Sequence, residues 1–206
     1  MIKLEKTDVF GWEAAIRGMR NPMNSWEKSD SIRCYRHDDA GFIIGKNDFA
    51  LMKKLSAAGT DHSKFMRMIN VTVDITAPLY WWKEYDTYKV GTVANSCSTM
   101  HKIHDKEFTM DDFSCEHLTE GATDVLIEVV KYLNFCRKLF IAKKNKQWWN
   151  NMIQMLPTSY NQKRTVQLNY QVLKNMYHAR KAHKLDEWRE FCKWIESLPY
   201  AELITE

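Results

Sequence analysis

Residues 67–78 read RMINVTVDITAP, and no other stretch constrains the fold as strongly. Apolar side chains occupy every second position within it: Ile69, Val71, Val73 and Ile75. Because successive side chains of a strand point to opposite faces of its sheet, this alternation predicts a strand with one buried face. Pro78 suits the first turn of a helix, so the sequence predicts that the strand leads into a helix over 79–88. The chain therefore contains a sheet with one face that other elements cover.

Helical patterns account for most of the remaining chain. The longest predicted helix covers 121–143. Its apolar stripe comprises Leu126, Val129, Val130, Leu133, Cys136 and Phe140. Shorter helices are predicted over 11–19, 47–58, 145–156, 170–182 and 186–198, and further strands over 1–9, 41–45 and 164–169. Helices with few, separated strands predict an α+β fold in which a small sheet packs with several helices.

Two helix ends carry local signals. Asn47 is predicted to cap the start of the 47–58 helix, and Gly59 follows its end, where glycine tolerates the left-handed backbone that ends many helices. Asn169 stands where the 164–169 strand becomes the 170–182 helix, so one interpretation of this residue is an N-cap.

No internal repeat, low-complexity tract or linker divides the 206 residues, so we predict a single domain over 1–206. Five cysteines without a CxxC pair favour reduced thiols and a cytoplasmic location. The first residues, MIKLEKTDVF, lack the apolar core of a signal peptide, and no apolar run is long enough to cross a membrane. We therefore expect a cytoplasmic protein without a membrane segment.

The charge pattern and the sparse motifs exclude several classes of protein. A net charge of +4 is spread along the chain, and the run KKNK at 143–146 is too short for a nucleic-acid surface, so no nucleic acid polymer is expected as a partner. The chain has no Walker-type glycine loop and no GxGxxG motif. No metal is expected either, because the candidate ligands fit no standard zinc spacing. Those candidates are Cys97, His101, His104, Cys115 and His117.

Arg180 poses a separate question. In the predicted 170–182 helix, Leu173, Met176 and Tyr177 lie along one face, and Arg180 continues that row. An unpaired buried charge costs several kcal/mol or more, so this guanidinium needs a partner. A carboxylate of the protein and an anionic ligand are the two alternatives. Asn175 lies off the apolar stripe, where it is either solvated or directed at a ligand.

These residues also form a recognisable pattern. The spacing LP-x11-N-x5-N-x4-R, formed by Leu156, Pro157, Asn169, Asn175 and Arg180, resembles the C-terminal signature of the flavin-dependent thymidylate synthases. Residues 62–102 are similar to the central segment of the same family. His62, Ala77 and Pro78 are in register there without gaps. The two matches together cover about 65 residues.

The resemblance implies a fold, ligands and an assembly. It implies FAD contacts at His62, Ser63, Tyr88, Asn169 and Asn175, and nucleotide contacts at Lys89, Cys97 and Arg180. In this family reduced flavin passes a methylene from a folate to a uracil and then supplies hydride, so NADPH and methylene-tetrahydrofolate are implied where the family reaction is retained. The family's flavin sites combine several subunits, which implies a homotetramer. We expect the aromatic helix face of Trp81, Tyr85 and Tyr88 to be covered in such an assembly.

The chain departs from the family pattern at several charged positions. Thr87, Tyr88 and Lys89 replace its Arg-His-Arg, and further replacements are Glu84, Asn95, Cys97, Thr99 and Ile153. Three alternatives follow: an enzyme that methylates a deoxyuridylate-like nucleotide, a nucleotide-binding protein without turnover, and a purely structural tetramer. Cys97 replaces a serine and is either a nucleophile toward C6 of a pyrimidine or a neutral exchange of one atom.

Overall fold

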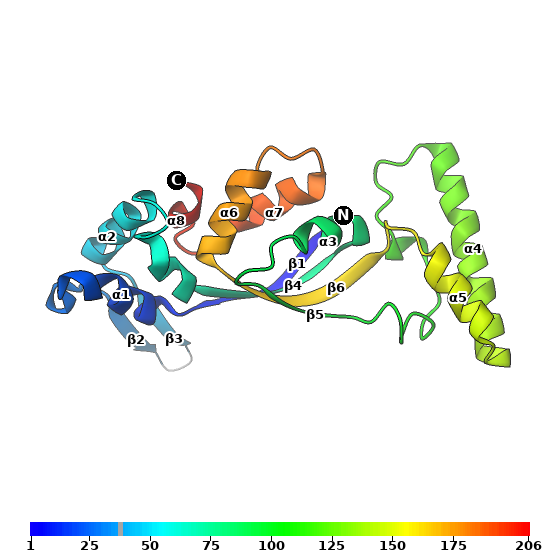
Figure 1. Cartoon of the computed structure of the whole chain (residues 1–206), viewed down its shortest axis with the longest axis horizontal. Helices are drawn as coiled ribbons and strands as arrows, with labels where there is room; N and C mark the ends of the chain where they lie inside the picture. Colours follow the sequence, from blue (N-terminus) through cyan, green and yellow to red (C-terminus); the bar gives the residue numbers. More distant parts are fainter. Residues whose placement is uncertain (37–38) are drawn as a thin grey trace. The chain divides into compact units, whose positions relative to one another are not determined.

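The computed structural model of the chain describes residues 1–36 and 39–206, with the backbone alone for residues 35, 36, 39 and 40. A small antiparallel sheet of four strands has the order β1-β4-β6-β5, and β2 and β3 form a separate hairpin (Figure 1). The strands are β1 (Lys3–Phe10), β2 (Ile32–Arg36), β3 (Asp39–Ile43), β4 (Asn70–Pro78), β5 (Val93–Ser96) and β6 (Asn161–Asn169).

Helices make up most of the rest of the described chain. The α-helices are α1 (Trp12–Arg20), α2 (Lys46–Ala57), α3 (Leu79–Tyr85), α4 (Glu120–Lys143), α5 (Lys146–Met155), α6 (Tyr170–Arg180), α7 (Asp186–Glu196) and α8 (Glu202–Thr205). Short 3-10 turns occur at η1 (Asn21–Met23), η2 (Trp26–Lys28), η3 (Ser63–Met68) and η4 (Met110–Asp112). The predicted α+β class is confirmed.

The chain divides into two compact units. Unit 1 comprises Met1–Lys3, Asp74–Thr87 and Ala94–Thr165. Unit 2 comprises Leu4–Val73, Tyr88–Val93 and Val166–Glu206. Strands β4 and β6 contribute residues to both units. The single domain over 1–206 stays a prediction.

The core of unit 1 lies between α4 and α5, which run side by side (Figure 1). The predicted inward stripe of α4 is confirmed. Leu126, Val130, Leu133 and Cys136 are buried, and Val129 and Phe140 pack against them half-buried. Asn145 caps α5, because its Oδ1 accepts a hydrogen bond from the backbone N–H of Gln147 at 2.8 Å.

Helix α3 is shorter than the sequence predicts, and the prediction of a helix as far as residue 88 is wrong. It ends at Tyr85, because the hydroxyl and the backbone N–H of Thr87 both donate to the carbonyl of Glu84 and close a turn there. Tyr88 therefore lies outside the helix. Trp81 and Tyr85 stack at 5.2 Å and are 0% and 2% exposed, so this aromatic face is covered by its own chain and needs no second subunit.

In unit 2 the alternation of β4 is confirmed, since Ile69, Val71 and Val73 are buried. The cap of α2 differs from the prediction. Gly45, not Asn47, occupies the N-cap position, and the carboxylate of Asp30 accepts the backbone N–H groups of Asn47 and Asp48 at 2.9 and 3.0 Å. A Cβ at Gly45 would lie 2.2 Å from Asp30 Cγ, so this position favours glycine. The carboxylate of Asp30, which is distant in the sequence, takes the place of the usual N-cap side chain.

A buried ion pair fixes the same end of α2. Arg20 and Asp48 are buried, and Arg20 Nη2 lies 2.6 Å from Asp48 Oδ1. The hydroxyls of Ser29 and Ser31 each donate to Asp48 Oδ2 at 2.6 Å. Burial raises the pKa of Asp48, but these hydrogen bonds and the charge of Arg20 outweigh that effect and hold the pKa below its ordinary value.

The β2–β3 hairpin contains one strand that the sequence did not predict. The predicted strand at 41–45 overlaps β3, whereas the sequence predicts no strand at the position of β2. Ile32 pairs with Ile43, and both side chains are more than half exposed. None of the described hairpin side chains, at 32–34 and 41–43, is buried, so they show no alternation of buried and exposed positions by which a strand is recognised.

Candidate functional site

Strand β6 passes directly into helix α6, and the side chain at the junction has two distinct ends. Asn169 Oδ1 accepts the backbone N–H of Val172 at 3.1 Å, so the interpretation as an N-cap is confirmed. Asn169 Nδ2 has no hydrogen-bond acceptor among the described residues, although the residue is only 9% exposed. The cap thus presents a nearly buried amide donor at the start of α6.

The segment Tyr88–Val93 packs closely against this helix start. Gly91 has a left-handed backbone with φ of +75°. A Cβ at Gly91 would lie 2.9 Å from Asn169 Nδ2 and 3.1 Å from Val172 Cγ2. The close approach therefore requires glycine.

A chain of hydrogen bonds connects two of the predicted FAD-contacting residues. The hydroxyl of Ser63, on η3, donates to Gln171 Oε1 at 2.7 Å, and Gln171 Nε2 donates to Asn175 Oδ1 at 3.3 Å. Ser63 is 2% exposed, so its hydroxyl orients Gln171, while Asn175 is exposed and enters this chain of bonds through its Oδ1 alone. Gln171 is therefore a site residue that the sequence pattern missed.

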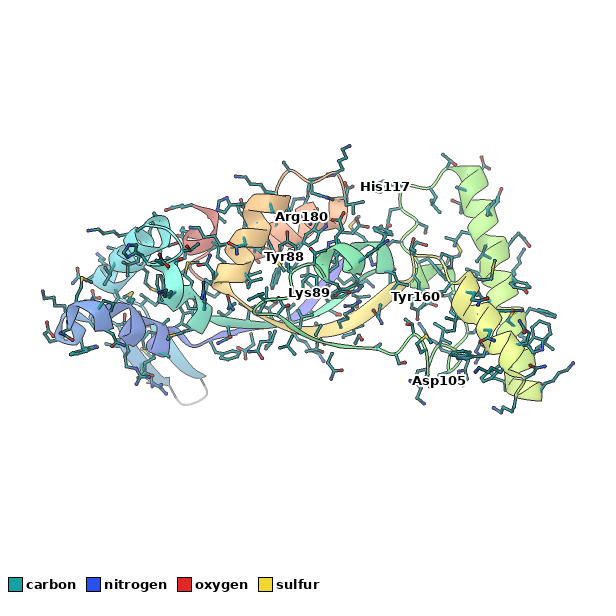
Figure 2. All side chains as sticks on the ribbon, viewed as in Figure 1. Tyr88, Lys89, Asp105, His117, Tyr160 and Arg180 are labelled. Atoms are coloured by element: carbon teal, nitrogen blue, oxygen red, sulfur yellow. The ribbon has the colours of Figure 1, made fainter. Side chains whose placement is uncertain are left out.

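Arg180 lies at the other end of α6 among aromatic rings. Its Nε donates to the hydroxyl of Tyr88 at 3.0 Å, and Figure 2 shows these two side chains next to each other. The guanidinium carbon lies 4.9 Å from the ring centroid of Trp188 and 5.6 Å from that of Tyr88. Two ring faces and a phenol oxygen stabilise a half-buried cation here.

Three further basic residues, on α6 or next to residues that contact it, differ in exposure and in contacts. Lys89 follows Tyr88 in the loop and is exposed, and His62 is exposed next to Ser63. Lys174, in the middle of α6, donates to Ser56 Oγ and to the carbonyl of Glu206, both at 2.9 Å. Burial lowers the pKa of Lys174, and the charge of Glu206 opposes that effect. Lys174 anchors the helix to Ser56 and to Glu206.

Cys97 lies in unit 1, on the wall of a cavity of about 810 Å3. Its backbone N–H donates to the carbonyl of Lys163 at 2.9 Å, and its carbonyl accepts from Gln162 Nε2 at 2.7 Å. The thiol is exposed, and Lys106 and Tyr160 line the same cavity. Burial raises the pKa of the Tyr160 phenol, and the charge of Lys106 acts in the opposite direction.

No helix within residues 1–36 and 39–206 is both long and apolar enough to cross a membrane. Within the same ranges no three His, Cys, Asp or Glu side chains are grouped so that they could hold a metal ion.

The fold has clear counterparts among solved structures. One is flavin-dependent thymidylate synthase ThyX from Helicobacter pylori complexed with FAD and dUMP, which matches 98% of this chain and 97% of its own with a TM-score of 0.71 at 17% identity. A second structure of that enzyme with FAD and dUMP matches 100% of this chain and 97% of its own with a TM-score of 0.70 at 16% identity. The chain has the fold of a flavin-dependent thymidylate synthase. At this level of identity the likeness extends to the fold alone. No protein-family model and no curated protein matches the sequence.

The structure brings seven of the eight predicted ligand residues into unit 2, on or beside α6. They are His62, Ser63, Tyr88, Lys89, Asn169, Asn175 and Arg180. Cys97 belongs to unit 1. Trp188 was missed because it lies on α7, and nothing in the local pattern of that helix distinguishes a ring that packs on Arg180 from a ring in the core.

The groups presented by α6 fit an oxygen-rich ligand. Two amide donors, Asn169 Nδ2 and Asn175 Nδ2, lie on the first two turns of the helix, and the guanidinium of Arg180 lies on its last turn. Amide and guanidinium donors complement the carbonyl oxygens of a flavin ring and the oxygens of a phosphate. The donor set is therefore chemically suited to FAD and to a nucleotide.

Proposed function

We propose that this chain is a flavin-dependent thymidylate synthase-like protein that binds FAD and a pyrimidine nucleotide at α6. The observation that carries the proposal is the placement of Asn169, Asn175 and Arg180 on one helix, at the spacing of that family's signature and within that family's fold. Each of these positions keeps a group that can donate hydrogen bonds to a ligand oxygen.

We assign the cofactor to the first half of the helix. Asn169 Nδ2 and Asn175 Nδ2 would donate to the flavin, Ser63 holds Gln171 and Asn175 in position, and His62 and Tyr88 would line the flavin site. When bound, FAD supplies the redox chemistry. The chain's own residues orient the ligands and exclude water around them.

We assign the nucleotide to the second half of the helix. Arg180 and Lys89 supply positive charge for its phosphate. Methylation of a deoxyuridylate-like nucleotide is the reaction that this arrangement serves, with methylene-tetrahydrofolate as the carbon donor and NADPH as the reductant. The protein acts in the cytoplasm as a homotetramer in this proposal.

A specific observation favours a second candidate, a nucleotide-binding protein without turnover. The Nε of Arg180 donates to the phenol oxygen of Tyr88, which stands where the family's Arg-His-Arg signature has its histidine. Each missing charge-assisted hydrogen bond costs about 1.5–3 kcal/mol. With fewer cations, a nucleotide is held more weakly and its pyrimidine is polarised less.

Product analysis distinguishes the two candidates. The purified chain is incubated with FAD, NADPH, methylene-tetrahydrofolate and dUMP, and nucleotides are separated by chromatography while flavin binding is followed by absorbance near ~450 nm. Formation of dTMP establishes the enzyme. Bound flavin or nucleotide without dTMP establishes the binding protein. Binding of neither ligand contradicts both.

A further inference from the structure

Unit 2 contains a cavity of about 550 Å3, and none of the described residues that line it is a predicted ligand residue. Its walls come from the end of β1, helix α1, the β2–β3 hairpin and residues 199–200. Small-molecule sites in proteins have volumes of about 300–1,000 Å3. The cavity is therefore large enough for a ligand of one or two rings.

Four aromatic side chains line this cavity: Phe10, Trp12, Phe42 and Tyr200. Two of them are fixed by packing, because the ring centroids of Trp12 and Tyr200 lie 5.2 Å apart, edge to face, and Trp12 makes a second such contact with Tyr170 at 5.2 Å. Phe10, in contrast, is 43% exposed. Rings that are already held in place bind another planar ring with little loss of side-chain freedom.

The backbone of Tyr200 is unusual. Its φ is +53°, in the left-handed region that a bulky side chain rarely adopts. The backbone N–H of Ile44 donates to the Tyr200 hydroxyl at 3.3 Å, and the Tyr200 ring lies 5.3 Å from that of Phe49. Such strain persists only where surrounding contacts hold it, and it is concentrated at ligand sites. The fold thus keeps this ring in the cavity wall despite an unfavourable backbone.

The charged side chains of the described lining are two arginines and one glutamate. Arg33 pairs with Glu13, and the hydrogen bond and charge of Arg33 lower the pKa of Glu13, with a smaller contribution from the charge of Arg17. Arg17 itself makes no hydrogen bond and no ion pair with a residue that the structure describes. The described lining therefore carries one uncompensated positive charge, on Arg17.

We propose that this cavity binds a small aromatic carboxylic acid, with its ring against Phe10 and Tyr200 and its carboxylate on Arg17. A guanidinium matches a carboxylate with two parallel hydrogen bonds. One carboxylate balances the one uncompensated charge, whereas a phosphate dianion would leave excess negative charge beside Glu13. This inference goes beyond the proposed function, since it uses no residue of α6 and needs neither FAD nor a nucleotide.

Three probes separate the contribution of the ring from that of the charge. They are naphthalene-2-carboxylate, its neutral carboxamide, and cyclohexanecarboxylate, each titrated into the full chain and followed by NMR of the probe. We expect saturable binding of naphthalene-2-carboxylate at one site per chain. The carboxamide lacks the charge and cyclohexanecarboxylate lacks the aromatic ring, so each should bind at least about 10-fold more weakly.

Variants assign the binding to the cavity. Arg17→Gln removes the charge and Phe10→Ser removes an exposed ring, so each should weaken binding of naphthalene-2-carboxylate by about 10-fold. The matched control is Arg67→Gln, which removes the same charge at an exposed position on η3 outside the cavity and should bind as the parent does. Circular dichroism confirms that every variant is folded.

Three results would each overturn the inference: no saturable binding to the parent, equal affinity in Arg17→Gln and the parent, or displacement of the probe by FAD or dUMP. The last result would make the cavity part of the site at α6. FAD titration of the same variants tests the proposed function separately, because none of the changed residues belongs to α6.

Discussion

At the scale of single residues, the two asparagines Asn169 and Asn175 each combine a structural contact with an amide group that takes no part in it. Asn169 uses Oδ1 to cap the helix and keeps Nδ2, and Asn175 accepts from Gln171 and keeps its own Nδ2. Arg180 donates one N–H to Tyr88 while its guanidinium lies against two rings. The sequence predicted that Arg180 needs a partner, but not that aromatic groups would supply part of its surroundings.

Changing Arg180 to Ala should weaken nucleotide binding by about 10-fold or more, because it removes charge-assisted hydrogen bonds to the phosphate. Isothermal titration with dUMP measures the loss, and the thermal midpoint shows whether the fold is intact. The matched control is Lys181→Ala, which removes the same charge one residue further along the chain. Equal affinity in the Arg180→Ala variant and the parent would refute the role of Arg180.

The five cysteines should differ sharply in reactivity. Cys97 is exposed, whereas Cys136 and Cys192 are buried. Burial and the charge of Glu196 raise the pKa of Cys192 to about 11, so little thiolate forms there at neutral pH. We expect a maleimide to label Cys97 first, as peptide mass mapping against Cys97→Ser would show. If Cys97 contacts the pyrimidine, dUMP slows its labelling; an unchanged rate excludes that contact.

At the scale of elements, the sequence predicted the strands and helices in which apolar residues recur at a regular spacing. The alternation in β4 and the inward stripe of α4 fix those elements, because burial of one face imposes a period of two or 3.6 residues. The cap of α2 was not predictable, since its acceptor, Asp30, lies far back in the chain. Hairpin β2–β3 was missed in part because its paired isoleucines are exposed on both strands.

The two roles of Asn169 can be separated by one substitution. Asn169→Asp keeps an oxygen for the cap of α6 and removes the Nδ2 donor, so stability should be preserved while FAD binding weakens. Asn169→Ala removes both and should cost about 1 kcal/mol of stability in addition. Thermal unfolding and FAD titration on the same samples give the two readouts. If Asn169→Asp binds FAD as well as the parent, the Nδ2 donor has no part in the site.

The ion pair at the start of α2 predicts a dependence of stability on pH. The pKa of Asp48 is lowered in the folded chain, so its contribution is fully present above the pKa of an unfolded aspartate, about 3.9, and is lost as pH falls through the lower folded value. Asp48→Asn should cost about 3–5 kcal/mol at neutral pH, because Arg20 is left buried without its counter-charge. Urea unfolding at pH 7 and pH 3 tests both statements. A variant as stable as the parent at pH 7 would contradict them.

At the scale of the whole molecule, one helix and its N-cap carry three of the eight predicted ligand residues, and the fold matches a flavin enzyme over nearly the full chain. The sequence signature predicted both, because the spacing of the two asparagines and the arginine is local to α6. The division into two units was not visible in the sequence, since β4 and β6 contribute to both and no linker marks a boundary.

The central claim is that α6 forms a flavin site, and an equilibrium titration of FAD against the purified chain tests it most directly. Quenching of flavin fluorescence is followed as protein is added. The account predicts saturable binding of about one FAD per chain, with an absorbance band near ~450 nm that stays with the protein through gel filtration. No saturable quenching, with a colourless protein after gel filtration, would contradict it.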